Sequence, residues 1–407
     1  MPYDTLTRFL FLPELKITAI FSTGRWAGYY KAQKTSKFEV CPKCATPSYS
    51  IYDHRNVTIR DEPIRRKAVF LLIKKRRFWC KACRKPFMEP ISGITKGHRS
   101  THRFKRGLQW ACDHFTDLNK VREAYKCAKS TLYKAHYEIL GQKQKARTYP
   151  LPKQLGIDEH SIRKPKYKST EYSTIVVDHK NRKIYDLFEG RSKEAIDNAF
   201  EKMNGKDNVE VVTMDMSPTY RSAMRRHFPN ATIVADRFHV QRMMNRLVNK
   251  KRKELTGDKR SHPIRTLLLR DNSKLDWDMK RRLSCWLNED KCRWLKEAYE
   301  FKEAISRLYR IKGYGRARTV WCKLMDRMGK SKDDEVKGVR ATLLNWGREI
   351  LSYFRFKLTN GRVEGFNRKA KLLQRRAYGY SNFQNYRLRL LNECSGRTVR
   401  MAPTLKR

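Results

Sequence analysis

Three acidic residues stand in contexts that fit metal-dependent chemistry on phosphate esters. Asp158 follows the apolar run QLGI, Asp215 ends the segment VEVVTMD, and Glu364 lies in NGRVEGFN. Carboxylate oxygens are preferred ligands of Mg²⁺, and a pair of such ions can activate the attacking oxygen and stabilise the leaving oxygen of a phosphodiester. We therefore expect these three acids to hold two Mg²⁺ or Mn²⁺ ions and to act in cutting and rejoining a phosphodiester backbone.

The elements that must position these acids follow a recognisable order. Apolar patterning predicts strands at 154–158, 172–178, 183–190, 209–215 and 231–236, with a helix at 192–204 after the third strand. A further long helix is expected from about Asn360 and would carry Glu364. This order is that of a ribonuclease-H-like fold. Asp158 would lie at the end of the first strand and Asp215 at the end of the fourth.

Other acids near these positions compete for the same role. Glu159 follows Asp158, but neighbouring strand residues point to opposite faces, so only one of them can face the site. Asp178 ends the second strand, where a role in a β-turn accounts for it. Asp236 and His239 would share one side of the helix that begins there. We expect this pair to form a structural hydrogen bond near the site or to help in handling the strand.

The helix that carries Glu364 also bears a row of polar and basic residues. They recur at spacings of three to four residues, so they share a face with Glu364; they are Asn367, Arg368, Lys371 and Arg375. One acid followed by cations suits a metal site beside a track for DNA phosphates, with Asn367 as an accessory residue. A solvated charged helix face is the alternative.

The overall charge points to a polyanionic partner. The 407 residues include 92 Lys and Arg against 41 Asp and Glu, which gives a net charge of +51. A charge of this size concerns partners rather than fold. We expect double-stranded DNA, and no membrane, because no apolar run approaches the ~20 residues of a spanning helix.

The ten cysteines are expected to be reduced. The apolar start FLFLPELKITAIF is broken by Pro13, Glu14 and Lys16 and is followed by no cleavage site, so it is not a signal peptide. We expect a bacterial cytoplasmic protein associated with the nucleoid. In a reducing compartment paired cysteines indicate a metal before a disulfide.

Two C-x-x-C pairs predict a structural zinc site. The four candidate ligands are Cys41, Cys44, Cys80 and Cys83, and the sequence between the pairs is rich in strand-forming residues. Both pairs can therefore close one site in a zinc-ribbon-like β module at about 1–100. Two unrelated cysteine pairs or a redox motif are the alternatives, and His54 and His98 lie close enough to replace a ligand. The basic run at 74–77 makes this module a plausible reader of DNA ends.

A helix-turn-helix is expected at about 101–145. The segment 102–115 has helical spacing, and 121–141 resembles two short helices, the second capped by Ser130 with Leu132, Tyr133 and Tyr137 packed inward. Four residues would then be free to enter a major groove: Lys129, Thr131, Lys134 and His136. A helical pair that serves only packing would look similar. Residues 142–153 are expected to form a linker to the catalytic domain at 146–407.

A large α-helical insertion is expected within that domain at about 245–355. Its segments show helical apolar periodicity, and its core would include Trp286, Trp294, Trp321 and Trp346. After the Glu364 helix, four aromatic residues alternate with arginines: Tyr378, Tyr380, Phe383 and Tyr386. Either base stacking or core packing would account for them. The predicted fold is thus multidomain α+β.

The chain resembles the DDE transposases of the ISL3 family of bacterial insertion sequences. The likeness extends from CPKC…FWCKACRKPF through LGIDE and VVTMDMSPTY to ADRFHV, NGRVEGFN and AYGYSNF, in the family's order. It implies the triad Asp158, Asp215 and Glu364, with Asp236 and His239 as the family's D-x-x-H element. The region 250–350 matches only in its helical character.

This resemblance implies an enzyme that binds the terminal inverted repeats of its element. It would hydrolyse one strand at the transposon end and then join the freed 3′-hydroxyl to target DNA. Because two ends must be held, a homo-oligomer on DNA is expected. The alternatives are a transposase-derived DNA-binding protein or repressor without cleavage, a nuclease of the same fold, and a zinc-dependent hydrolase, which lacks an open His-rich site. The intact triad argues against the first of these.

Overall fold

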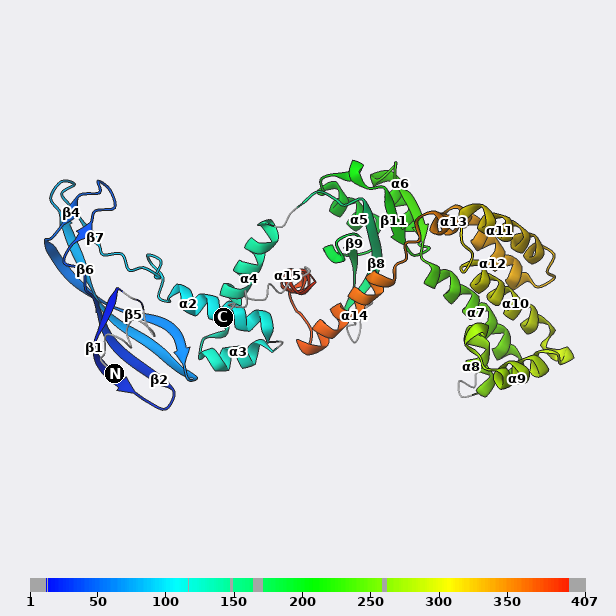
Figure 1. The fold of residues 1–407 in the computed structure, drawn as a ribbon, viewed down its shortest axis with the longest axis horizontal. Helices are drawn as coiled ribbons and strands as arrows, with labels where there is room; N and C mark the ends of the chain where they lie inside the picture. The colour runs from blue at the N-terminus through cyan, green and yellow to red at the C-terminus, as the bar shows by residue number, and fades with distance from the viewer. Residues whose placement is uncertain are drawn as a thin grey trace, which may run out of the picture. The chain divides into compact units, whose positions relative to one another are not determined.

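The computed structural model describes residues 12, 14–115, 117–146, 149–163, 171–257 and 262–394. The chain forms two compact units, Met1–Ala146 and Arg147–Arg407 (Figure 1). The division of the first unit into two domains near residue 100 stays a prediction. In the part that the structure describes, every helix is too short or too polar to cross a membrane.

The first unit is built on a twisted β-sheet with a long hairpin. Strands pair in the order β1-β2-β6-β5, and β7 adds to β6. The strands are β1 (Leu15–Thr23), β2 (Ala27–Lys34), β5 (Ile51–Ile64), β6 (Lys67–Cys80) and β7 (Lys85–Met88). A separate two-stranded piece, β3 (Glu39–Val40) with β4 (Pro47–Ser48), follows β2. Leu15, Leu71 and Ile73 are among the buried residues that form the core of the larger sheet.

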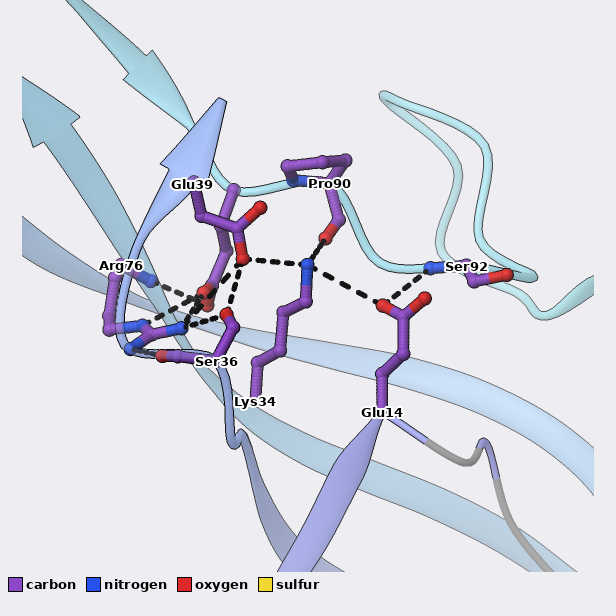
Figure 2. Close-up of polar contacts among 8 residues, drawn as sticks. Glu14, Lys34, Ser36, Glu39, Arg76, Pro90 and Ser92 are labelled. Carbon is purple, nitrogen blue, oxygen red and sulfur yellow. Dashed lines mark hydrogen bonds and ion pairs between the residues drawn. The ribbon is translucent and has the colours of Figure 1, made fainter. Parts of the chain in front are cut away.

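A buried ion network joins β3 to this sheet (Figure 2). Lys34 Nζ lies 2.6 Å from Glu39 Oε1 and donates a hydrogen bond of 2.9 Å to the carbonyl of Pro90. Arg76 donates to the buried Glu89 carboxylate at 2.8 Å. Removing one partner of a buried ion pair leaves an uncompensated charge, so this network fixes β3 against β6.

Among the described residues of the first unit, three helices follow the sheet. They are α2 (His102–His114), α3 (Leu118–Tyr125) and α4 (Lys129–Ala146). Thr101 caps α2 by accepting a hydrogen bond from the amide of Phe104 at 3.1 Å, and it donates at 2.7 Å to Asp61 of β5. Arg103 also binds Asp61. The helices are therefore attached to the sheet of their own unit.

Two expectations for α4 are wrong in detail. The helix begins at Lys129, so Ser130 lies inside its first turn and is not the cap. It continues to Ala146, so the expected linker begins later, because Gln, Lys and Ala at 142–146 are good helix formers. Of the expected linker residues, 147 and 148 lie outside the described residues.

The second unit is built on a five-stranded mixed sheet. Its order is β10-β9-β8-β11-β12, with β8, β9 and β10 antiparallel and β8, β11 and β12 parallel. The strands are β8 (Gln154–Arg163), β9 (Glu171–Asp178), β10 (Lys183–Glu189), β11 (Val211–Met214) and β12 (Thr232–Ala235). All five predicted strands of this part are present.

Helices pack against this sheet. Those nearest to it are α5 (Lys193–Glu201), α6 (Pro218–His227), α13 (Gly347–Phe356), α14 (Gly361–Arg376) and α15 (Phe383–Glu393). Short 3₁₀ turns lie at Lys206–Asn208, Asn272–Lys274 and Asp290–Cys292. The predicted β-turn role of Asp178 is confirmed, because this carboxylate accepts a hydrogen bond of 2.9 Å from the amide of Asn181.

The segment between β12 and α14, where a helical insertion was predicted, is helical in its described residues. Its helices are α7 (Arg237–Thr256), α8 (Pro263–Leu269), α9 (Trp277–Leu287), α10 (Arg293–Leu308), α11 (Tyr314–Gly329), α12 (Asp334–Asn345) and then α13. α12 ends at Asn345, and α13 begins at Gly347 directly after Trp346. Trp321 and Trp346 are buried as expected, but Trp294 is 40% exposed, so its expected core role is wrong.

Candidate functional site

The register of the parallel strands brings three carboxylates into one row. Gly156 of β8 is level with Thr213 of β11, and Thr213 is level with Val234 of β12. Asp158, Asp215 and Asp236 each lie two residues beyond these positions, just past the last paired residues of the adjacent parallel strands. Sites of α/β proteins form at this edge of a sheet.

The position of Asp158 differs from the expectation in one respect. β8 does not end at Asp158 but continues to Arg163, paired with β9. Its pairing with the shorter β11 ends at Gly156, however. Asp158 is therefore free of β11 although it lies in the middle of its own strand. Glu159 beside it forms an ion pair with Arg191 at 2.8 Å, and its charge also acts to raise the pKa of Asp215.

The two aspartates of the expected triad share a buried electrostatic environment. Burial, and then the charge of Asp215, raise the pKa of Asp158 to about 7. Burial also raises the pKa of Asp215. Oδ1 of Asp215 is buried and accepts no hydrogen bond from the residues that the structure describes. Two carboxylates that resist ionisation beside each other, one with an unpartnered oxygen, are suited to a divalent cation.

His239 links two carboxylates of the row. As predicted, its Nδ1 lies 3.2 Å from Oδ2 of Asp236, and its Nε2 lies 3.6 Å from Oδ2 of Asp215. Burial acts to lower the pKa of His239, but the hydrogen bond with Asp236 and the charge of Asp215 raise it overall. A histidine cation here offsets part of the negative charge of the row.

Asn360 attaches the start of α14 to all three strands. Its Nδ2 donates to the carbonyl of Ile157 at 2.9 Å, and its Oδ1 accepts from Thr213 Oγ1 at 2.7 Å. Its backbone amide donates to Oδ1 of Asp236 at 3.1 Å. The sequence indicated Asn360 only as the start of a helix; the side chain makes no cap hydrogen bond and is buried. No sequence signal separates this use of an asparagine from ordinary capping.

A glycine lets α14 approach β8 closely. A Cβ added at Gly156 would lie 2.6 Å from Cγ2 of Val363 and 2.7 Å from Nε2 of His179. His179 is buried and lies 2.7 Å from Thr213 Oγ1, and burial lowers its pKa to about 4. Gly156 and His179, which sequence reasoning missed as parts of the site, thus set the contact between helix and sheet.

The third acid of the expected triad lies on α14 but is held by a neighbour. Glu364 Oε1 is 2.6 Å from Arg368, and this pair is partly exposed. Asn367, three residues further along the helix, donates to Oδ2 of Asp158 at 2.8 Å. Asn367 is therefore in contact with the carboxylate row, whereas among the described residues the Glu364 carboxylate is joined by a hydrogen bond or ion pair only to Arg368.

The four cysteines of the first unit meet in one cluster. The sulfur atoms of Cys41, Cys44, Cys80 and Cys83 all lie within 4.8 Å of one another. The two pairs come from the turn before β4 and the turn between β6 and β7. Four thiolates at this separation can bind one tetrahedral zinc ion. His54 and His98 are outside the cluster.

Three of the four residues expected to contact DNA from α4 are exposed, and the fourth is buried. Lys129, Thr131 and Lys134 are exposed. His136 is 1% exposed, and its Nδ1 lies 3.3 Å from Oε1 of Gln109, so its expected place in a DNA groove is wrong. The reason is helical periodicity: His136 lies one turn from the buried Leu132 and shares its face. On α14, Arg368, Lys371 and Arg375 are all exposed, as expected.

Comparison with known proteins agrees with these features. Residues 155–390 match a family model described as "Transposase" of the ISL3 group with a DDE site. Residues 37–83 match a model described as "zinc-finger of transposase IS204/IS1001/IS1096/IS1165", which supports a structural zinc ion on the four cysteines. The chain is 26% identical over 386 residues to the transposase for insertion sequence element IS1001 of Bordetella parapertussis, covering 90% of this chain and 91% of that protein. The chain therefore belongs to the ISL3 family of insertion-sequence transposases.

Proposed function

We propose that the chain binds the terminal inverted repeats of an insertion sequence, cleaves one DNA strand at each end and transfers the freed 3′-hydroxyl to target DNA. The observation that carries this proposal is the pair of largely buried acids Asp158 and Asp215, just past the paired residues of adjacent parallel strands. Among the described residues, Oδ1 of Asp215 has no hydrogen-bond partner. Family membership supports a DNA-cleaving enzyme in general.

The catalytic unit is proposed to have a ribonuclease-H-like fold. Three antiparallel strands followed by two parallel ones, in the order β10-β9-β8-β11-β12, support this assignment. The domain limits proposed for it are 146–407, with the helical insertion at about 245–355. In this arrangement the sheet supplies two acids, and the helix α14 supplies the third.

Asp158, Asp215 and Glu364 are the proposed ligands of two Mg²⁺ or Mn²⁺ ions. When bound, such ions activate the attacking oxygen and stabilise the leaving one. Glu364 lies one helical turn from Asn367, which already contacts Asp158, and positions three apart on a helix are ~5–6 Å apart at Cβ. Release of Glu364 from Arg368 would let the carboxylate turn to the row and the guanidinium turn to a DNA phosphate.

The remaining residues of the site hold its geometry. Asn367 orients the Asp158 carboxylate through its amide, and Asn360 fixes the beginning of α14 to the strands. His239 and Asp236 form the accessory pair that faces Asp215. Lys371 and Arg375 continue the exposed face of α14 as contacts for phosphate groups.

DNA recognition is proposed for the first unit. Its zinc module and the helices α2–α4, as a helix-turn-helix, would grip the terminal repeat, with Lys129, Thr131 and Lys134 toward the groove. The net charge of +51 supports strong binding to duplex DNA that weakens as salt increases. Since both ends of an element must be held together, we expect a homo-oligomer on DNA.

The test is cleavage of a labelled duplex that bears the element's own end, with Mg²⁺ or Mn²⁺. The wild type should nick at the end, and Asp215→Asn should bind the duplex without cutting it. Asp207→Asn, the same change at an exposed position before β11, serves as the control and should cut normally. If all three bind and none cuts with either metal, the chain is a transposase-derived DNA-binding protein.

A further inference from the structure

The four aromatic residues that follow α14 differ in how far their side chains are buried. Tyr386 is fully buried, and Tyr380 and Phe383 pack against it with ring centroids 5.1 and 6.4 Å away. Tyr378, by contrast, is 99% exposed. Core packing thus accounts for three of these aromatics, and Tyr378 requires another explanation.

Tyr378 has a left-handed backbone conformation, which is strained for any residue that carries a Cβ and would be relaxed in glycine. Tyr378 has φ 53° and Gly379 has φ 96°, so both adopt the left-handed region where α14 ends. The amide of Gly379 donates to the carbonyl of Gln374 at 2.9 Å and closes the helix. A residue with a Cβ is disfavoured in this region, and glycine is the usual choice at such helix ends. Tyr378 is also the only aromatic residue with positive φ among the described residues.

Tyr378 lies at the end of the basic face of α14. Arg368, Lys371 and Arg375 are exposed on the face that begins with Glu364. Within the described residues no carboxylate pairs with Lys371 or Arg375, so their charges are available to an anionic ligand. From Glu364 to Tyr378 the helical rise is about 20 Å. A strand whose phosphates follow this face would bring its bases to Tyr378.

We propose that Tyr378 is a stacking platform for an unpaired base of the DNA strand that runs along α14. Aromatic side chains combined with a basic track are the usual means of holding unpaired nucleotides, because every base offers a π-face. The inference rests on the proposed function and adds a contact that recognises strand opening about 20 Å from the proposed cleavage site. A ligand that stacks on the ring accounts for the exposure of Tyr378.

The experiment uses two end-labelled DNAs with the element's terminal repeat. One is a blunt duplex, and the other has unpaired terminal nucleotides that include 2-aminopurine, whose fluorescence falls when it stacks. Full-length wild type, Tyr378→Gly, Tyr378→Trp and the control Trp277→Ala are compared. Trp277 is another exposed aromatic of the same unit, 71% exposed, at the start of α9.

The wild type should quench 2-aminopurine, and Tyr378→Gly should lose this quenching and bind the unpaired DNA roughly 5- to 100-fold more weakly. Its affinity for the blunt duplex should change little, and its melting temperature should not fall, because glycine relieves the strain. Tyr378→Trp and Trp277→Ala should behave as the wild type. Equal losses on both DNAs, or no loss on either, would overturn the inference.

Failure of this inference can be told apart from failure of the proposed function. If the wild type cleaves the blunt duplex with Mg²⁺ while Tyr378→Gly binds unpaired DNA normally, only the stacking role is wrong. If the wild type cleaves neither DNA, the proposed function fails, whatever the fluorescence shows.

Discussion

At the scale of single residues, the decisive feature is the protonation of Asp158. Burial, and then the neighbouring Asp215, hold its pKa near 7, whereas an unfolded chain gives about 3.9. Between these values the folded protein binds a proton that the unfolded chain releases. The contribution of Asp158 to stability is therefore present at low pH and is lost as pH rises through about 7.

This predicts a difference in pH dependence between the wild type and Asp158→Asn. In metal-free buffer, the melting temperature of the wild type should fall relative to that of the variant as pH rises from about 4 to about 7. Mg²⁺ should restore the melting temperature of the wild type above pH 7, because the cation stabilises the ionised carboxylate of Asp158. Thermal melts of both proteins across this pH range test the prediction. If the two plots of melting temperature against pH run parallel, the pKa of Asp158 is not raised in the folded protein.

At the scale of elements, α14 is positioned by Asn360 rather than by ordinary capping. Asn360→Ala would remove the amide group that accepts from the buried Thr213 hydroxyl and donates to the Ile157 carbonyl. We expect a loss of about 2–4 kcal/mol in the free energy of unfolding, measured by urea denaturation. DNA cleavage should fall further than the stability loss alone predicts, since the helix that carries Glu364 is released.

Asn382→Ala provides the matched control for this change. Asn382 is a true cap, whose side chain accepts a hydrogen bond of 3.0 Å from the amide of Asn385 at the start of α15. Its loss should cost about 1 kcal/mol and leave the cleavage rate nearly unchanged. Equal effects of the two substitutions would mean that Asn360 acts only as a cap.

The sequence predicted the elements of the second unit better than their contacts. Alternating and helical apolar patterns placed all five strands and α14, because these patterns follow from which faces are buried. The row formed by Asp236 with Asp158 and Asp215 depends on strand register, which no local pattern records. The buried face of α4 was misjudged at His136 for a different reason: helical spacing from Leu132 places this residue in the core, but its polar side chain suggested an exposed position.

At the scale of the whole molecule, the two units should respond separately to loss of zinc. The cysteine cluster lies wholly within Met1–Ala146, and structural zinc supplies folding energy to the module that binds it. A strong zinc chelator should therefore lower the unfolding temperature of the first unit and abolish specific DNA binding. The unfolding temperature of the second unit should not change.

Differential scanning calorimetry with and without the chelator measures both transitions, and Cys83→Ser should reproduce the chelated state without chelator. The exposed Cys322, outside the cluster, gives the control variant Cys322→Ser, which should melt as the wild type does. A shift of both transitions by equal amounts would contradict independent folding of the two units.

The central claim is that Asp158, Asp215 and Glu364 together bind the divalent cations of the cleavage reaction. The most direct measurement is calorimetric titration of Mn²⁺ into the zinc-loaded protein bound to an uncleavable DNA end, for wild type, Asp215→Asn, Glu364→Gln and Asp207→Asn. We predict that Mn²⁺ binds the wild type and Asp207→Asn alike, that Asp215→Asn loses most of this binding, and that Glu364→Gln loses part of it. Unchanged Mn²⁺ affinity in Asp215→Asn would contradict the account.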